Sequence, residues 1–326
     1  MKISIIIICK NEEKVIDKCI KSSIISIKEF GMGEIILVDS NSEDKTLTIA
    51  LETFAKMKFN SYKIIKIESN YYTAALARNI GMKESNGEFL LFLDGDMILY
   101  KNFLENINYI KGNIVGLVGK RYDITDLHNV IIKEFVRDKK FNNKIIDIGG
   151  AVLLHREKIG NIKFNPIQKT REEETMAKKL SLNKKYINYL NEKMYIHIDY
   201  KRKERSLFKR INQINQTIID LKIAVKDFYK KVGIKKTFYL YKEYIFNFIV
   251  IPIAILFLFL FGLSMNKLLV VIAILSLMLY VIKFRLRSIF SILLLKSFII
   301  NTDIKQEYNI LEYIDGGIYE NKNRTC

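Results

Sequence analysis

Two carboxylates separated by a single glycine, Asp94-Gly95-Asp96, directly follow the apolar run at residues 89–93. A short apolar run predicts a buried strand, and ligands of open α/β sheets bind just beyond the carboxyl ends of the strands. Two acids with a small residue between them can both face a divalent cation, which prefers oxygen ligands. Such a cation would neutralise a diphosphate. The alternative is a solvated turn, because Asp-Gly is a common turn dipeptide.

Polar residues follow two other apolar runs in the same way. Asp39 closes the run at 35–38, and the polar segment 9–12 follows the run at 3–8. Three strands would then bring polar side chains to one edge of a sheet, and this convergence predicts a binding site better than any single strand does. Asp39 could instead cap the helix expected after it, a role that Ser42 could serve equally well.

Charged side chains in two predicted helices could complete such a site. Arg78 could bind an anionic phosphate or fix an acid by a forked hydrogen bond, and a surface salt bridge is its alternative role. Three consecutive glutamates at 172–174 begin a helix expected over 170–180. Their negative charge would favour the helix start electrostatically.

The elements that must position these residues alternate between strands and helices. The expected strands are 3–8, 35–38, 62–67, 89–93 and 114–118, and the expected helices are 12–30, 44–58, 73–85 and 101–110. Asn11 and Ser42 precede acidic pairs and resemble helix N-caps. The alternation predicts an α/β fold with a mixed, mostly parallel sheet and helices on both faces. A turn at Gly149-Gly150 leads into one further strand.

Positive charge is concentrated just before the most apolar part of the chain. The net charge is +18, and residues 200–243 hold 13 Lys or Arg against 4 Asp or Glu. A nucleic acid or an anionic membrane surface would suit this charge, and the neighbouring apolar segment favours the membrane. The apolar spacing over 204–236 predicts a basic amphipathic helix on the membrane surface. The alternative is a helix packed on the preceding domain. We expect membrane lipids as partners and no nucleic acid.

Two apolar segments predict a membrane hairpin. Residues 245–263 contain no charge and are long enough to cross the hydrocarbon core, whereas 268–282 is short and needs snorkelling lysines at its ends. Basic residues flank both outer ends, so the positive-inside tendency places those ends and the preceding domain in the cytoplasm, at the cell membrane. Residues 289–300 are expected to be interfacial. A buried hairpin of a soluble protein is the alternative.

The motifs resemble, in order and spacing, those of family-2 glycosyltransferases, which have the GT-A nucleotide-sugar transferase fold. The resemblance is strong over residues 1–100 and loose over 145–200. Four segments carry it: Lys10-Asn11-Glu12-Glu13, Asp39-Ser40-Asn41-Ser42, Ala77-Arg78-Asn79-Ile80-Gly81 and Leu93-Asp94-Gly95-Asp96.

The resemblance implies a donor site with a divalent cation, Mn²⁺ or Mg²⁺. By position, Glu12 and Asp39 match residues that contact the nucleoside, and Arg78 matches the residue near the base and phosphates. Asp94 matches the residue near the donor ribose and the metal, and Asp96 matches the metal ligand. The resemblance favours UDP as the nucleotide.

The resemblance also implies a general base on the acidic helix. The family has an acidic pair there, usually Glu-Asp, and counting back from Leu180 places Glu173 at the second acid, which would deprotonate the acceptor. This chain has Glu-Glu instead, so Glu172 and Glu173 both stay candidates. His197 lies where some relatives have a histidine near the metal, although a lone histidine in an apolar strand is more often structural.

The implied activity is inverting transfer of one sugar from a nucleotide-sugar to a lipid-linked or membrane glycan acceptor, in surface polysaccharide or glycolipid synthesis. The chain lacks the Gln-x-x-Arg-Trp element of processive synthases. Two alternatives are a polyprenyl-phosphate sugar synthase and a degenerate, non-catalytic nucleotide-binding protein. The expected parts are a catalytic domain at 1–203 (nucleotide binding at 1–100, acceptor and base at 101–203), a basic juxtamembrane segment at 204–243, the membrane hairpin with its interfacial segment at 244–300, and a tail at 301–326.

Overall fold

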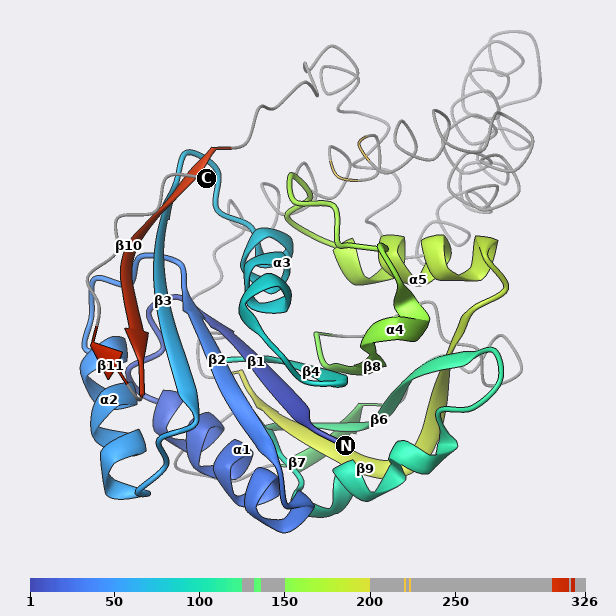
Figure 1. The fold of residues 1–326 in the computed structure, drawn as a ribbon, viewed down its shortest axis with the longest axis horizontal. Helices are drawn as coiled ribbons and strands as arrows, with labels where there is room; N and C mark the ends of the chain where they lie inside the picture. The colour runs from blue at the N-terminus through green and yellow to red at the C-terminus, as the bar shows by residue number, and fades with distance from the viewer. Residues whose placement is uncertain are drawn as a thin grey trace, which may run out of the picture. The chain divides into compact units, whose positions relative to one another are not determined.

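The computed structural model describes residues 1–124, 132–135, 150–199, 307–316 and 318–319, together with Asp220 and Ile223. The chain divides into two compact units, one formed by residues 1–204 with 305–326 and the other by 205–304. The described residues of the first unit form a large mixed sheet flanked by helices (Figure 1).

Four parallel strands form the centre of the sheet. They are β1 (Ile3–Cys9), β2 (Gly33–Asp39), β3 (Tyr62–Ser69) and β4 (Phe89–Asp94), in the spatial order β3-β2-β1-β4. All seven residues of β1 and most of those of β2 and β4 are buried. Continuous apolar runs are what a strand covered on both faces requires, and this is why the sequence predicts these strands closely.

The second half of the sheet is largely antiparallel. It consists of β5 (Met97–Leu99), β6 (Ile114–Ile124), β7 (Ile132–Phe135), β8 (Val152–His155) and β9 (Tyr186–Ile198), and of the pairs between these strands only β6–β9 is parallel. Strand β8 also joins β4 in antiparallel orientation. The expectation of a mostly parallel sheet therefore fits only strands β1 to β4, which crossover helices connect.

Helices cover both faces of the sheet, as expected. They are α1 (Ile16–Phe30), α2 (Thr46–Lys56), α3 (Ala74–Glu84), the 3₁₀ helix η1 (Lys101–Tyr109), α4 (Arg156–Ile159) and α5 (Glu172–Leu182). In Figure 1, α1 and α2 lie on one side of the sheet, and α3, α4 and α5 lie on the other. Helix α3 packs closely on β1 at Gly81. A Cβ there would lie only 2.3 Å from Cγ2 of Ile6, so the close approach requires a glycine.

Asn11 and Ser42 do not cap helices, contrary to the sequence prediction. Val15 and Lys45 occupy the N-cap positions of α1 and α2 without side-chain cap bonds. Asn11 and Ser42 instead link two loops: the Asn11 amide donates to Ser42 Oγ over 2.8 Å, and the Glu43 amide donates to Asn11 Oδ1 over 2.9 Å. These polar residues thus stabilise the loops after β1 and β2, at the edge where the site lies.

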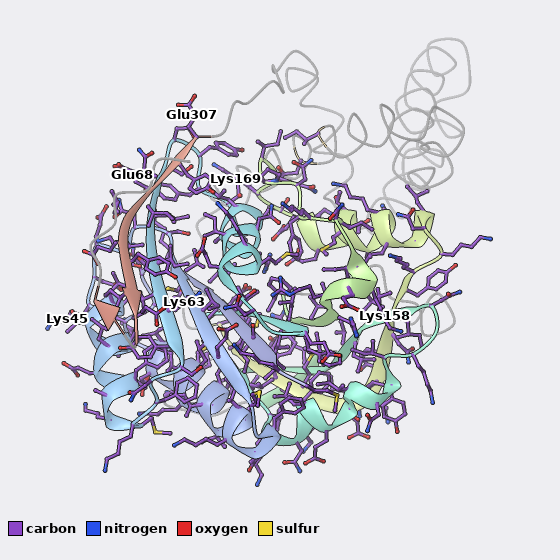
Figure 2. The ribbon with its side chains drawn as sticks, in the orientation of Figure 1. Lys45, Lys63, Glu68, Lys158, Lys169 and Glu307 are labelled. Carbon is purple, nitrogen blue, oxygen red and sulfur yellow. The ribbon has the colours of Figure 1, made fainter. Side chains whose placement is uncertain are left out.

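Residues 308–315 return to the sheet. Strand β10 (Tyr308–Asp315) pairs antiparallel with the outer edge of β3, and β11 (Ile318–Tyr319) pairs with β10. In Figure 2, Glu68 and Glu307 lie at the same end of this strand pair. The segment 301–326 is therefore not a separate tail in its described part. Ile310 and Ile314 are buried there, and β10 covers the exposed edge of β3.

The segments predicted to meet the membrane, 204–243 and 244–300, lie outside the described residues apart from Asp220 and Ile223. Within the described ranges, none of the helices is both long enough and apolar enough to span a membrane.

Candidate active site

Three neighbouring strands end together at one edge of the sheet, as the sequence predicts. The parallel register places Cys9 beside Asp39 and Ile8 beside Asp94. The Gly95 amide donates to the Ile8 carbonyl over 2.9 Å, which holds the acidic triplet against the end of β1. The loops after β1, β2 and β4 therefore surround one location.

Arg78 lies at the centre of this location and is 1% exposed. Its Nη1 is 2.5 Å from Glu172 Oε1, and its Nη2 is 2.8 Å from Asp94 Oδ1 and 3.3 Å from Glu173 Oε1. Burial alone would lower the pKa of the guanidinium, but the three carboxylates outweigh burial and raise that pKa. Arg78 is thus not at the surface, and it fixes acids from two distant parts of the chain.

Asp94 and Glu172, which both contact Arg78, have raised pKa values. The pKa of Asp94 is raised to about 6. Burial is the main cause and the charge of Asp96 adds to it, whereas the charge of Arg78 acts in the opposite direction. Burial also raises the pKa of Glu172 well above its usual value, and the neighbouring Glu173 raises it further. Three carboxyl groups thus share one guanidinium, and a cation bound beside them would favour their ionised forms.

The three glutamates at the start of α5 have different surroundings. The Glu172 side chain is 5% exposed and lies against Arg78, whereas Glu173 is 15% exposed at a longer distance from the same guanidinium. Glu174 turns away and pairs with Arg171 and Lys178, which lower its pKa against the effect of burial. Glu173 is thus the more accessible of the two acids that face the cluster.

Asp96 and His197 meet on the side of the cluster formed by β5 and β9. Met97 pairs with His197 across these strands, and Asp96 Oδ2 lies 3.2 Å from His197 Nε2. Burial would lower the pKa of His197, but hydrogen bonds to Asp123 and Asp96 raise it to about 9. A positive charge is therefore favoured beside Asp96.

These residues fit a divalent cation in part. The other oxygen of Asp96, Oδ1, is buried and has no hydrogen-bond partner among the described residues. The described ranges contain no group of three or more His, Cys, Asp or Glu side chains that could hold a metal ion by themselves. A site of one or two protein ligands completed by substrate phosphates is typical of Mg²⁺ in phosphate-handling enzymes. Asp96 and His197, with Asp94 nearby, could hold a cation that a diphosphate completes.

Two residues expected to contact the nucleoside have different positions. Asp39 is fully buried, and its Oδ2 accepts a hydrogen bond from the Ser42 amide over 2.8 Å. It therefore holds the loop after β2. Glu12 is half-buried beside the acidic triplet, since its Cγ lies 3.3 Å from the position of a Cβ on Gly95.

Three residues near the site were not among the predicted site residues. Gly150 has a φ of +91°, its carbonyl accepts from Arg78 Nη2 over 3.3 Å, and a Cβ there would lie 2.8 Å from Asp94 Oδ2. The glycine pair at 149–150 is a signal that could have identified it. Arg121 and Asp123, which contact His197, belong to no recognisable motif.

Comparison with known proteins agrees with this geometry. Residues 4–161 match the model of glycosyl transferase family 2. The chain is 32% identical over 124 residues to glycosyltransferase AglE of Haloferax volcanii, covering 38% of this chain and 40% of that protein. It is 30% identical over 175 residues to the UDP-Glc:alpha-D-GlcNAc-diphosphoundecaprenol beta-1,3-glucosyltransferase WfgD of Escherichia coli, covering 51% of this chain and 65% of that protein. It thus spans less than two thirds of either relative.

Among solved structures, the fold is similar to that of the mannosyltransferase PcManGT from Pyrobaculum calidifontis in complex with GDP-Man and Mn²⁺. The TM-score is 0.61 at 13% identity, and the match covers 88% of this chain and 84% of the other. This likeness identifies the sheet and its helices as the GT-A fold.

Proposed function

Residues 4–161 form a glycosyl transferase family 2 domain, and from this premise we propose that the chain transfers one sugar, with inversion, from a nucleotide-sugar to a membrane-associated acceptor. One observation carries the proposal: Arg78 joins Asp94 at the end of β4 to Glu172 and Glu173 at the start of α5. A donor-side acid and a candidate base therefore belong to one connected site.

Glu173 is the proposed general base. Its carboxylate is the more accessible of the two that face Arg78, and at neutral pH a carboxylate can take the proton of an acceptor hydroxyl. Attack by the resulting oxygen on the face of the sugar opposite the nucleotide inverts the anomeric carbon. The deeper Glu172 supports this arrangement by holding the other end of the Arg78 guanidinium.

The donor would bind at the edge formed by β1, β2 and β4. Asp96 and His197, with Asp94 nearby, are the proposed site for Mn²⁺ or Mg²⁺, which when bound would stabilise the negative charge of the leaving diphosphate. Glu12 lies beside the triplet and is proposed to contact the donor. Asp39 and Arg78 are buried, so we propose that they serve the donor indirectly, through the loop after β2 and through Asp94.

A thermal-shift screen of UDP-, GDP- and dTDP-sugars, each with and without Mn²⁺ or Mg²⁺, tests the donor and the metal together. We expect one nucleotide class to raise the melting temperature, and to do so only with metal, because the acids around Arg78 repel a bare diphosphate. UDP is the favoured class, and WfgD, by its name, uses UDP-Glc. A metal-independent shift would contradict the proposed ligands, and no shift with any sugar nucleotide would contradict the function.

We further propose that the chain acts at the cytoplasmic face of the cell membrane on a lipid-linked acceptor. Support comes from the uncharged residues 245–263 and from WfgD, whose acceptor by name is a diphosphoundecaprenol. Because β9 and β10 belong to one sheet, both ends of the intervening segment lie on the same side of any membrane. The number of crossings must be even, so a crossing by 245–263 requires a second one, for which 268–282 is the candidate.

Single cysteines test this topology in sealed, inside-out membrane vesicles of a Cys326→Ser chain, in which the remaining Cys9 and Cys19 are buried. Ser206→Cys and Thr302→Cys should react with a membrane-impermeant maleimide. Asn266→Cys should react only after the vesicles are opened, because it would lie in the turn of the hairpin. Reaction of Asn266→Cys in sealed vesicles would exclude the hairpin.

A further inference from the structure

Partly buried polar residues on β6 and β9 form a chain that leads to the proposed metal ligands. Strand β6 runs parallel to β9 and places Asp123 beside His197. Arg121 Nε donates to Asp123 Oδ1 over 2.7 Å, and the same Oδ1 lies 3.1 Å from His197 Nδ1. The other imidazole nitrogen, Nε2, faces Asp96. One ring thus lies between two carboxylates.

The chemistry of each neighbour limits where the imidazole hydrogens can be. A cation that shares Nε2 with Asp96 must replace the hydrogen on that nitrogen, because binding needs its lone pair, so the ring hydrogen that remains must be on Nδ1. Asp123 can accept this hydrogen. Arg121 Nη2, 2.9 Å from the same Nδ1, can only donate and would favour the opposite tautomer. Asp123 therefore favours the tautomer that binds a cation, and Arg121 favours the one that does not.

We propose that Asp123 is a positioning residue that holds His197 with its hydrogen on Nδ1 and thereby directs Nε2 to the cation at Asp96. The inference rests on the proposed function insofar as it uses the same metal site. A carboxylate behind a metal-binding histidine fixes the ring orientation and tautomer, and its loss typically lowers metal affinity about 10- to 100-fold. Arg121 has the complementary role of holding the Asp123 carboxylate in place through Nε.

Titration of the purified full-length chain with Mn²⁺ tests the proposal. Asp123→Leu should weaken Mn²⁺ binding about 10- to 100-fold, and Asp123→Asn, whose amide oxygen can still accept, should weaken it less. Tyr122→Phe is the matched control. It lies on the same strand with its side chain in a separate hollow of about 440 Å³ with Tyr100 and Lys193, and it should bind Mn²⁺ normally.

A double-mutant cycle separates positioning from general damage to the fold. If Asp123 acts through the imidazole, Asp123→Leu should cause no further loss of Mn²⁺ affinity in a His197→Ala chain. An equal loss in both backgrounds would overturn the proposal, as would unchanged affinity of Asp123→Leu in the wild-type background. Both outcomes concern binding alone. A chain that follows the cycle but transfers no sugar would contradict the proposed function and leave the role of Asp123 intact.

A spectroscopic signature provides a second readout. In a chain labelled with ¹⁵N-histidine, an imidazole nitrogen bound to Mn²⁺ should give ¹⁵N modulation of the electron spin echo. Only three histidines are present. The modulation should be lost in His197→Ala and weakened in Asp123→Leu at saturating Mn²⁺. Full modulation in Asp123→Leu would show that His197 needs no positioning partner.

Discussion

Replacing Glu173 with Gln should lower sugar transfer about 10²- to 10⁴-fold, the range of a lost general base. Gln keeps the size of the side chain but cannot take a proton from the acceptor hydroxyl at neutral pH. Donor affinity should change little, because the proposed donor contacts come from other residues. The measurement is kcat for transfer, together with the dissociation constant of the nucleotide-sugar in the presence of metal.

The two neighbouring glutamates provide matched controls for this change. Glu174 pairs with Arg171 and Lys178 away from the cluster. The kcat of a folded Glu174→Gln chain should therefore equal that of the unaltered chain, even if the variant is less stable. Glu172→Gln should alter stability, because its carboxylate is buried against Arg78. A Glu173→Gln chain with normal turnover would disprove the proposed base, and an inactive but well-folded Glu172→Gln chain would transfer that role to Glu172.

Replacing Arg78 with Met should lower the free energy of unfolding by about 3–5 kcal/mol, the usual cost of removing one partner of a buried ion pair. Met fills a similar volume, but the Glu172 carboxylate would stay buried without a counterion. Transfer should also be lost, because Arg78 holds Asp94 and Glu173 in one site. Urea unfolding of the whole chain, monitored by circular dichroism, measures the change in the free energy of unfolding.

A compensating substitution distinguishes lost charge balance from lost packing. In an Arg78→Met chain, adding Glu172→Gln removes the most deeply buried of the three carboxylates that lose their partner, and it should restore part of the stability. A double variant no more stable than the single one would mean that packing, not charge, explains the loss. Arg156→Met is a comparison in which no carboxylate loses an ion-pair partner. Arg156 donates hydrogen bonds to the backbone carbonyls of Met82, Ser85 and Gly87 instead.

The first hundred residues could be predicted from the sequence because their signals are local. Apolar runs such as residues 3–8 and 89–93 form strands, and parallel strands end at a common edge. The acids that follow the runs therefore lie at one end of the sheet, on either side of β1, where Asp39 pairs with Cys9 and Asp94 with Ile8. The motif resemblance to family-2 glycosyltransferases is confirmed by the family match.

The rest of the site depends on contacts between distant segments, which leave no local signal. Nothing near Arg78 predicts that Glu172, 94 residues away, would bury it. Asp123 belongs to no recognisable sequence motif, and it is the pairing of β6 with β9 that places it beside His197. Strand β10 has mixed polarity, as an edge strand with one exposed face does, and its partner β3 precedes it by more than two hundred residues.

The most direct test of the central claim is the anomeric configuration of the sugar released when the full-length chain slowly hydrolyses its nucleotide-sugar, with water as the acceptor. ¹H NMR during the first minutes, before mutarotation, distinguishes the two anomers without knowledge of the natural acceptor. An α-linked donor should yield the β sugar first, in a reaction that requires metal and is lost in Glu173→Gln. Initial release of the α sugar, or hydrolysis that Glu173→Gln leaves unchanged, would contradict inverting transfer by this site.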